Sequence, residues 1–428
     1  MKILHVSPMY APALGGAEHH LQAISEGLVC RGHAVTVFTA NVVNGLDAWL
    51  SRHGGLPEVE FINGVKVVRF DPEGGLLAKA FDKWLRLKGG WRSVNYIFTP
   101  GGLELLSQGP RTLTMIPQIL RCNADIIASM NWYWPPAYHT YLAGRLKRFT
   151  LVGIPLFHTA QPWCNRSIYR RMLPSHDAVI VNTNYEGQFA QERGATRVEV
   201  TGVGIDPHTF DRRRGEDVRA YYGLGSFPVV GFVGRQEATK GVVKLIEAMR
   251  TVWEWNKEVR LVLAGPRSDE KVEAKLVNLP SNQKARIVQI GLFEEKDKGS
   301  IFDAFDVFAM PSREESFGIT YLEAWLCNKP VIGARIGPTQ CVIDEGRDGL
   351  LADPEDPEDI ARAIIALLSN SNMREKLGRS GHDKAIAQYT WDKVVDKVEG
   401  LYLGLAATKA ARGFAKLLPS NQIATPGS

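Results

Sequence analysis

A short apolar run that ends in a polar loop and leads into an amphipathic segment constrains the fold more than any other feature of this chain. Residues 307–310 are apolar and typical of a buried strand, which Pro311 ends. Residues 317–327 repeat apolar side chains with the period of a helix, and Ser316 is a candidate N-cap. This order of strand, loop and helix predicts an open α/β sheet, in which ligands bind at the carboxyl ends of the strands.

Two glutamates flank this predicted helix start. Glu315 lies in the loop and Glu323 about two turns into the helix, so we expect the two carboxylates to contact different parts of one ligand. A ligand with a sugar at one end and a ribose at the other fits, because both offer hydroxyl donors. The backbone N–H groups of Phe317, Gly318 and Ile319 would face an anion at the helix start. Without further signals, two solvated glutamates would be the more common interpretation.

A second strand and helix carry two cations at their junction. Residues 229–233 predict a buried strand, Gly234 a tight turn, and residues 242–248 the start of a helix. Arg235 and Lys240 flank that helix start, where a guanidinium fork and an ammonium group suit a diphosphate leaving group. Two such cations alone are more often solvated surface residues, so the phosphate interpretation depends on the glutamates described above.

The N-terminal segment predicts a third unit of this kind. Residues 3–6 are typical of a buried strand, Gly15 and Gly16 open a helix, and residues 35–39 form the next strand. The unit lacks the G-x-G-x-x-G fingerprint of dinucleotide-binding proteins and the acidic residue that follows it. A nicotinamide-dependent dehydrogenase is therefore disfavoured, and the glycine pair is either a ligand loop or a plain structural turn.

These segments together resemble family 4 of the retaining glycosyltransferases, the glycosyl transferases group 1, which have the GT-B fold. Glu315 and Glu323 have the spacing of the family's E-x7-E motif, and residues 316–318 match its S-F-G. Arg235 and Lys240 match the cations that bind the donor diphosphate in the family.

The resemblance implies an α/β chain with two Rossmann-like parallel-sheet domains that face a cleft. Residues 1–203 are expected to form the N-terminal, acceptor-binding domain, and residues 204–390 the C-terminal domain, which binds the nucleotide sugar. Residues 391–403 are expected to form a helix that crosses back to the N-terminal domain. Residues 404–418 would pack on that domain, and residues 419–428 would form a flexible tail.

The resemblance also implies which residues form the site. The expected catalytic residues are Glu315, His158, Arg235 and Lys240. His158 follows a strand predicted over residues 150–156, where a lone histidine is more often structural. The expected donor contacts are Gly15, Gly16, Gly234, Arg235, Lys240, Leu292, Glu315, Ser316, Phe317, Gly318, Ile319 and Glu323. Trp132, Tyr133 and Trp134 follow another strand and are candidates for stacking against an acceptor sugar.

By this resemblance we expect a retaining glycosyltransferase that moves a sugar from a nucleotide-diphosphate sugar to a glycan or lipid-linked acceptor, in polysaccharide or glycolipid synthesis. Arg235 and Lys240 would stabilise the departing diphosphate. Glu315 would bind hydroxyls of the transferred sugar, and Glu323 the ribose. No cofactor or metal ion is expected, since the chain has no D-x-D motif. A sugar-nucleotide epimerase, a phosphorylase of the same fold and a nucleotide-binding scaffold without catalysis stay open as alternatives.

Length and composition agree with this class. A chain of 428 residues is long enough for two domains of typical size. The five cysteines form no C-x-x-C pair, so neither a disulfide framework nor a zinc site is predicted. The first apolar run is too short for a signal peptide, and no apolar stretch reaches about 18 residues. A cytoplasmic protein is therefore expected.

Basic residues cluster with aromatic and aliphatic side chains in three regions, although the formal net charge is only +5. The clusters comprise Lys79, Lys83, Trp84, Arg86, Lys88, Trp91 and Arg92; Arg145, Lys147, Arg148, Arg166, Arg170 and Arg171; and Lys409, Arg412 and Lys416. Such clusters suit an anionic membrane surface, so peripheral attachment to the inner face of the membrane stays open. Solvated faces are an equally common explanation. Nucleic acid is not an expected partner, because no reader motif accompanies the charge.

Overall fold

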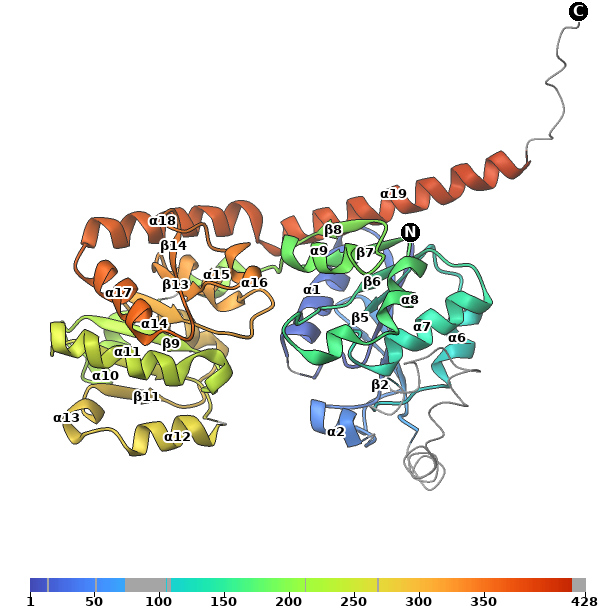
Figure 1. The fold of residues 1–428 in the computed structure, drawn as a ribbon. Helices are drawn as coiled ribbons and strands as arrows, with labels where there is room; N and C mark the ends of the chain where they lie inside the picture. The colour runs from blue at the N-terminus through green and yellow to red at the C-terminus, as the bar shows by residue number, and fades with distance from the viewer. Residues whose placement is uncertain are drawn as a thin grey trace, which may run out of the picture.

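In the computed structural model of the protein, the chain forms two lobes, each built on its own β-sheet (Figure 1). The structure describes residues 1–13, 15–50, 52–73, 105, 109–211, 213–267 and 269–417, and only the backbone of Trp49 and residues 409–417. Across these ranges no helix is long and apolar enough to cross a membrane. The predicted tail, the basic cluster at residues 79–92 and the side chains of the cluster after residue 408 lie outside the described part.

The first lobe holds an eight-stranded sheet in the order β3-β4-β2-β1-β5-β6-β7-β8. All neighbouring strands run parallel except β3 and β4. The strands are β1 (Lys2–Ser7), β2 (Ala34–Ala40), β3 (Val59–Ile62), β4 (Val65–Phe70), β5 (Ile126–Met130), β6 (Leu151–Ile154), β7 (Ala178–Val181) and β8 (Val198–Val200). The helices are α1 (Gly16–Cys30), α2 (Gly45–Leu50), α6 (Met115–Arg121), α7 (Pro135–Leu146), α8 (Tyr169–Met172) and α9 (Asn184–Gln191), with short 3-10 turns η1 (Pro162–Asn165) and η2 (Leu173–Ser175).

The second lobe holds a six-stranded parallel sheet in the order β11-β10-β9-β12-β13-β14. Its strands are β9 (Val229–Val233), β10 (Arg260–Ala264), β11 (Ile287–Ile290), β12 (Val307–Met310), β13 (Val331–Ala334) and β14 (Gly349–Ala352). Its helices are α10 (Gly215–Tyr221), α11 (Val242–Trp255), α12 (Glu270–Val277), α13 (Ser281–Lys284), α14 (Lys298–Asp303), α15 (Ile319–Leu326), α16 (Gly337–Gln340), α17 (Pro357–Leu368) and α18 (Ser371–Gln388), with 3-10 turns η3 (Pro207–Phe210), η4 (Ala238–Lys240) and η5 (Glu295–Asp297).

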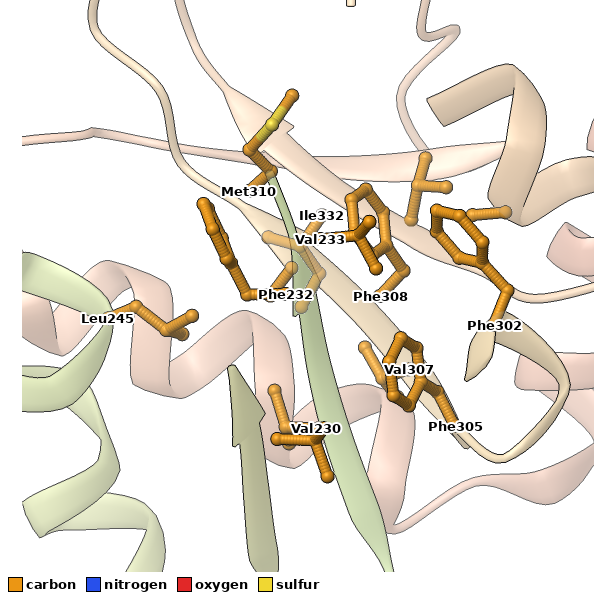
Figure 2. Close-up of a cluster of buried hydrophobic side chains, with 14 of the residues drawn as sticks. Val230, Phe232, Val233, Leu245, Phe302, Phe305, Val307, Phe308, Met310 and Ile332 are labelled. Atoms are coloured by element: carbon orange, nitrogen blue, oxygen red, sulfur yellow. The ribbon is translucent and has the colours of Figure 1, made fainter. Parts of the chain in front are cut away.

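The core of the second lobe fixes β9 beside β12. Phe302 packs against Phe305 and Phe308, with ring centroids 6.0 and 5.3 Å apart (Figure 2). Gly231 in β9 faces the Phe305 ring so closely that a Cβ atom there would overlap it. Burial of each large apolar side chain contributes about 1.5–3 kcal/mol. Because β9 and β12 pair directly, their carboxyl ends and the loops that follow lie next to each other.

One long helix, α19 (Trp391–Leu417), leaves the second lobe and packs on the first (Figure 1). Its apolar face, including Val394, Val398 and Tyr402, is buried in the core cluster of the first lobe. Glu399 adds polar contacts, with its carboxylate 2.7 Å from Nη1 of Arg31 and 2.7 Å from Nε2 of His33. The helix that crosses back therefore completes the first lobe.

Two chain segments cross between the lobes side by side. The backbone N–H of Ile205 donates to the carbonyl of Tyr389 at 2.8 Å, and that of Trp391 donates to the carbonyl of Ile205 at 3.3 Å. Gly204 lies against the Trp391 ring, which leaves no space for a side chain. These contacts hold the two crossing segments together where the lobes meet.

The strand predicted over residues 150–156 is shorter than expected. It ends at Ile154, and Leu156 has φ 55°, in the left-handed region that extended strands do not use. His158 therefore lies in a loop that turns sharply after β6, instead of directly continuing a strand.

Candidate active site

A cavity of about 370 Å³ lies between the two lobes, next to the carboxyl ends of β9 and β12. In the order β10-β9-β12 the strand order reverses at β9, which is where open α/β sheets bind ligands. Nine predicted site residues line the cavity: Gly16, His158, Gly234, Lys240, Glu315, Ser316, Phe317, Gly318 and Ile319. The structure thus brings together residues that the sequence places in four separate segments.

The loop between β12 and α15 owes its shape to Gly318. The helix begins at Ile319, and Gly318 caps it with φ 91°, a conformation that residues with a side chain rarely adopt. A Cβ atom there would also overlap the Tyr321 ring, which is fixed because its hydroxyl donates to the Met310 carbonyl at 2.7 Å. The prediction that Ser316 caps this helix is therefore wrong.

Lys240 and Glu315 form an ion pair in the cavity wall. The Lys240 Nζ atom lies 2.8 Å from Oε2 of Glu315, and Oε1 of Glu315 accepts a hydrogen bond from the Ser316 N–H at 3.2 Å. Lys240 ends η4, immediately before Gly241, whose φ of 82° starts α11 and whose missing side chain lets it pack on the Pro311 carbonyl. Both charged side chains are largely buried, with exposures of 22% and 10%.

Glu323 is buried on α15 without lining the cavity, and it pairs with a residue that sequence reasoning missed. Nζ of Lys298 lies 2.6 Å from Oε1 of Glu323 and 3.1 Å from Glu295. Oε2 of Glu323 has no hydrogen-bond partner among the described residues. Burial raises the pKa of Glu323, against the opposing effect of the Lys298 ammonium. Oε2 is therefore a buried acceptor whose hydrogen-bonding capacity is unused in the described part of the chain, and Lys298 directly follows η5.

His158 faces both charges of the ion pair. Its pKa is lowered chiefly by desolvation, with the Glu315 carboxylate raising it and the Lys240 ammonium lowering it. A neutral imidazole has one nitrogen that donates and one that accepts. Its loop is tied down by Cys164, whose thiol donates to the His158 carbonyl at 3.0 Å. Near it, Gln161 donates a hydrogen bond to Glu314, a direct contact between the lobes.

Two buried polar residues of the first lobe also line the cavity and were not predicted. His20, on α1, is 2% exposed, and burial lowers its pKa to about 4. Asn182 follows β7 and is 6% exposed. Both ring nitrogens of His20 and Oδ1 of Asn182 have no partner within the described part of the chain. No local sequence pattern marks them, because their place in the cavity follows from how α1 and β7 pack.

The remaining predicted donor residues do not line the cavity. Arg235 is 65% exposed at its rim, with Nη1 2.7 Å from Oε1 of Glu237. Leu292 is 84% exposed, and Gly15 packs against the Glu18 carboxylate beside the cavity. Glu323 is buried and does not line the cavity, as described above.

The aromatic run after β5 differs from its expected role. Trp132 is fully buried, and its indole N–H donates to the carbonyl of Ser129 at 3.1 Å. Trp134 is also buried, and Tyr133 packs edge-on against it and against Trp163. Trp132 has no exposed ring face, so the prediction that it stacks on an acceptor sugar is wrong for this residue. Gly153 contributes to this, because it leaves the space that the Trp132 ring fills.

Comparisons with known proteins match both lobes. Residues 14–209 match the family described as Glycosyltransferase Family 4, and residues 219–384 match Glycosyl transferases group 1. A D-inositol 3-phosphate glycosyltransferase of Stackebrandtia nassauensis is 26% identical over 94% of this chain and 90% of its own length. One from Corynebacterium urealyticum is 31% identical over 57% of this chain, but the match spans only 61% of that relative.

The fold has close counterparts among solved structures. Anabaena HepE in complex with UDP and glucose superposes with a TM-score of 0.69 at 18% identity, over 94% of this chain and all of that one (100%). At this identity the likeness concerns the fold alone. The sequence matches cover both lobes. The two facing sheets and the helix that returns to the first lobe give the architecture. The protein therefore belongs to family 4 of the glycosyltransferases, the glycosyl transferases group 1, and has the GT-B fold.

Proposed function

We propose that the protein transfers a sugar from a nucleotide-diphosphate sugar to a hydroxyl group of a glycan or lipid-linked acceptor, with retention of configuration. The ion pair of Lys240 and Glu315 in the cavity between the lobes carries this proposal. The names of the similar proteins support it, since the Stackebrandtia relative is called a glycosyltransferase and the HepE structure holds UDP and glucose.

The second lobe offers a complementary group for each part of such a donor. Lys240 supplies a positive charge for the diphosphate, and the N–H groups at the start of α15 supply the helix dipole. Glu315 would accept hydrogen bonds from the sugar hydroxyls, and the free oxygen of Glu323 from the ribose. Arg235 at the rim would exchange Glu237 for the diphosphate when the donor binds.

Charge development explains why these groups favour transfer. As the bond between sugar and diphosphate breaks, negative charge grows on the leaving phosphate, and Lys240 and Arg235 would stabilise it. The acceptor hydroxyl would attack from the same face, and the leaving phosphate would take its proton. His158, neutral because its pKa is lowered, would hydrogen-bond a hydroxyl of the sugar. Closure of the lobes would exclude water and so limit donor hydrolysis.

A lipid-linked acceptor is the more specific part of the proposal. Arg145 and Arg148 are exposed on the first lobe, and Leu146 between them is 74% exposed. Cations beside an exposed apolar side chain suit the headgroup region of an anionic bilayer. Such a surface would bring the first lobe to its acceptor.

The test is the reaction itself, measured as release of nucleoside diphosphate and formation of a longer product from UDP-, GDP- and ADP-sugars. Lys240→Ala and Glu315→Gln are expected to lower kcat about 10²–10³-fold, by loss of charge stabilisation and sugar binding. Lys275→Ala is a matched control, because it breaks a Lys–Glu pair of the same 2.8 Å length that joins α12 to Glu247 on α11, away from the cavity. Chelation of metal ions should leave the rate unchanged.

The products separate the alternatives. An epimerase would return a nucleotide sugar of changed configuration, a phosphorylase would require inorganic phosphate, and a scaffold would bind nucleotide without turnover. Retention is read from the anomeric coupling constant of the product by NMR. Near-normal turnover in both cavity variants would contradict the assignment of the site.

A further inference from the structure

Glu186 is a buried carboxylate that joins two loops of the first lobe. It lies in the first turn of α9 and is 2% exposed. Its Oε1 atom accepts a hydrogen bond from the backbone N–H of Phe157, and its Oε2 atom one from that of Asn182, both at 2.8 Å. Phe157 directly precedes His158, and both His158 and Asn182 line the cavity. One side chain therefore sets the position of cavity-lining segments that follow two different strands, β6 and β7.

We propose that Glu186 is a positioning residue for the transfer reaction: its ionised carboxylate holds the His158 and Asn182 segments in the geometry that catalysis requires, and its protonation releases them. The inference rests on the proposed function, since it names what orders the first-lobe wall of the same site.

The chemistry of the carboxyl group explains why ionisation matters. An ionised carboxylate accepts at both oxygens, so each N–H has a partner. A protonated group carries O–H on one oxygen, which leaves one buried N–H without an adequate acceptor. The loop is also strained, because Leu156, next to Phe157, has φ 55°. A loop in a conformation of this kind persists only while its surroundings fix it, and the hydrogen bond from the Phe157 N–H to Glu186 is one of the contacts that do so.

The buried environment of Glu186 places its pKa near neutral pH. Burial raises its pKa to about 7, against the lowering effect of the two N–H groups. The ionised form therefore dominates above about pH 7 and the protonated form below it.

Few other titratable groups face this carboxyl. The Cys164 thiol on η1 is one of them. Burial raises its pKa to about 12, with the negative charge of Glu186 as a second cause, so the thiol stays neutral. Neither β7 nor α16, which both pack on α9, carries a charged residue. On β8, Val198 and Val200 pack against Gly187, so Glu199 between them points to the opposite face. The His158 ring interacts with Glu315 and Lys240 instead.

The experiment compares pH–rate profiles of the wild-type protein and Glu186→Gln between about pH 6 and 9. Glutamine keeps the size but has one oxygen and one NH₂, so it resembles the protonated acid at every pH. For wild type we expect kcat to fall as pH drops through about 7. For the variant we expect kcat to be about 10- to 100-fold lower, because a displaced loop misplaces its catalytic groups. We also expect the variant's kcat not to fall as pH drops through about 7. The donor Kd should change much less, because Lys240, Glu315 and Glu323, the charged groups proposed to bind the donor, lie on the second lobe.

Hydrogen exchange provides a readout that does not depend on activity. After correction for intrinsic rates, the amides of Phe157 and Asn182 should exchange faster in Glu186→Gln than in wild type at pH 8, and faster in wild type at pH 6 than at pH 8. Glu192→Gln, an exposed neighbour at the end of the same helix, is the matched control and should match wild type in both assays.

The outcomes separate this inference from the proposed function. The positioning role is overturned if kcat of the Glu186→Gln variant still falls as pH drops through about 7. It is also overturned if the Phe157 and Asn182 amides exchange at the wild-type rate in that variant. If wild type transfers no sugar, the proposed function fails while the exchange comparison still decides the role of Glu186. If Glu186→Gln does not fold, Glu186→Asp takes its place: it stays ionisable but reaches only one amide, so the fall in kcat should persist at a lower overall rate.

Discussion

Lys240 and Glu315 lie 75 positions apart in the sequence, yet their Nζ and Oε2 atoms are 2.8 Å apart in the wall of the cavity. The two loops that carry them follow β9 and β12, which are neighbours in the sheet. The two side chains thus neutralise each other's charge. A bound donor would replace the ion pair between them, because its diphosphate would contact Lys240 and its sugar hydroxyls would donate to Glu315.

The first prediction concerns ligand stabilisation. A nucleoside diphosphate at about 100 times its Kd should stabilise the protein by about 2.7 kcal/mol and raise its melting temperature by several degrees. Lys240→Ala should abolish most of this shift at the same ligand concentration, because the cation that meets the diphosphate is gone. Thermal unfolding with UDP, GDP and ADP measures it, with Lys275→Ala as the variant that should respond like wild type. An unchanged shift in Lys240→Ala would place the diphosphate elsewhere.

The second prediction concerns Lys298, which touches Glu323 and not the cavity. In Lys298→Met the pKa of Glu323 should rise further, because burial already raises it and the cation that opposes the rise is lost. The protonated group is a weaker acceptor, so we expect KM for the donor to increase about 10-fold while kcat changes little. Steady-state kinetics measure both constants. Lys296→Met, which removes a largely exposed neighbouring cation, should leave KM unchanged.

The third prediction concerns Gly318. Alanine there would hold φ 91° at a cost of about 1–2 kcal/mol, and its Cβ atom would push against the Tyr321 ring. The loop that carries Glu315 should shift, with a lower melting temperature and at least a 10-fold loss of kcat/KM. Gly45→Ala, where a Cβ atom meets nothing, is the control. Wild-type kinetics in Gly318→Ala would show that the loop tolerates the side chain.

The fourth prediction concerns stability and its dependence on pH. Asp348 is 1% exposed and its carboxylate lies 2.8 Å from the Lys384 ammonium. Burial raises the pKa of Asp348 and Lys384 opposes this, so in Lys384→Met the folded-state pKa should lie higher still. Loss of one partner of a buried pair costs about 3–5 kcal/mol.

The sign of the pH effect follows from that raised pKa. The folded variant holds its Asp348 proton more tightly than the unfolded chain does, so its stability falls as pH rises toward the folded-state pKa. The deficit in melting temperature relative to wild type should therefore be larger at pH 8 than at pH 5. Lys376→Met on the same helix, where the lysine is exposed, should show no deficit at either pH. A deficit that grows toward acid would refute this account.

Local patterns predicted the strand–loop–helix units, because strand burial and helix periodicity are properties of short stretches of sequence. The grouping of distant segments into one site came instead from the resemblance to a known family. The cap of α15 was missed because Ser316 is a good N-cap by residue type, whereas the position of Gly318 follows from how Tyr321 packs on Met310. Trp132 was misjudged for a similar reason: the space that receives its ring is created by Gly153 on a neighbouring strand.

The contact of Glu186 with Phe157 could not be predicted from local sequence patterns. Thr183 and Glu186 have the spacing of a capping box, and the Thr183 hydroxyl does accept a hydrogen bond from the Glu186 N–H at 3.1 Å. That pattern predicts the start of α9. It does not predict that the carboxylate reaches Phe157, because that contact joins residues 29 positions apart through the packing of two strands.

The helix α19 has a consequence for how the protein is made. The core of the first lobe includes Val395, Leu401 and Leu405, which follow the whole second lobe in the chain. When residues 1–203 have been translated, the first lobe therefore still lacks α19, and the face of α1 that packs on it stays uncovered while about 190 further residues are made, roughly 10–40 seconds at about 5–20 residues per second. The core of the first lobe is therefore completed only after the whole second lobe has been synthesised.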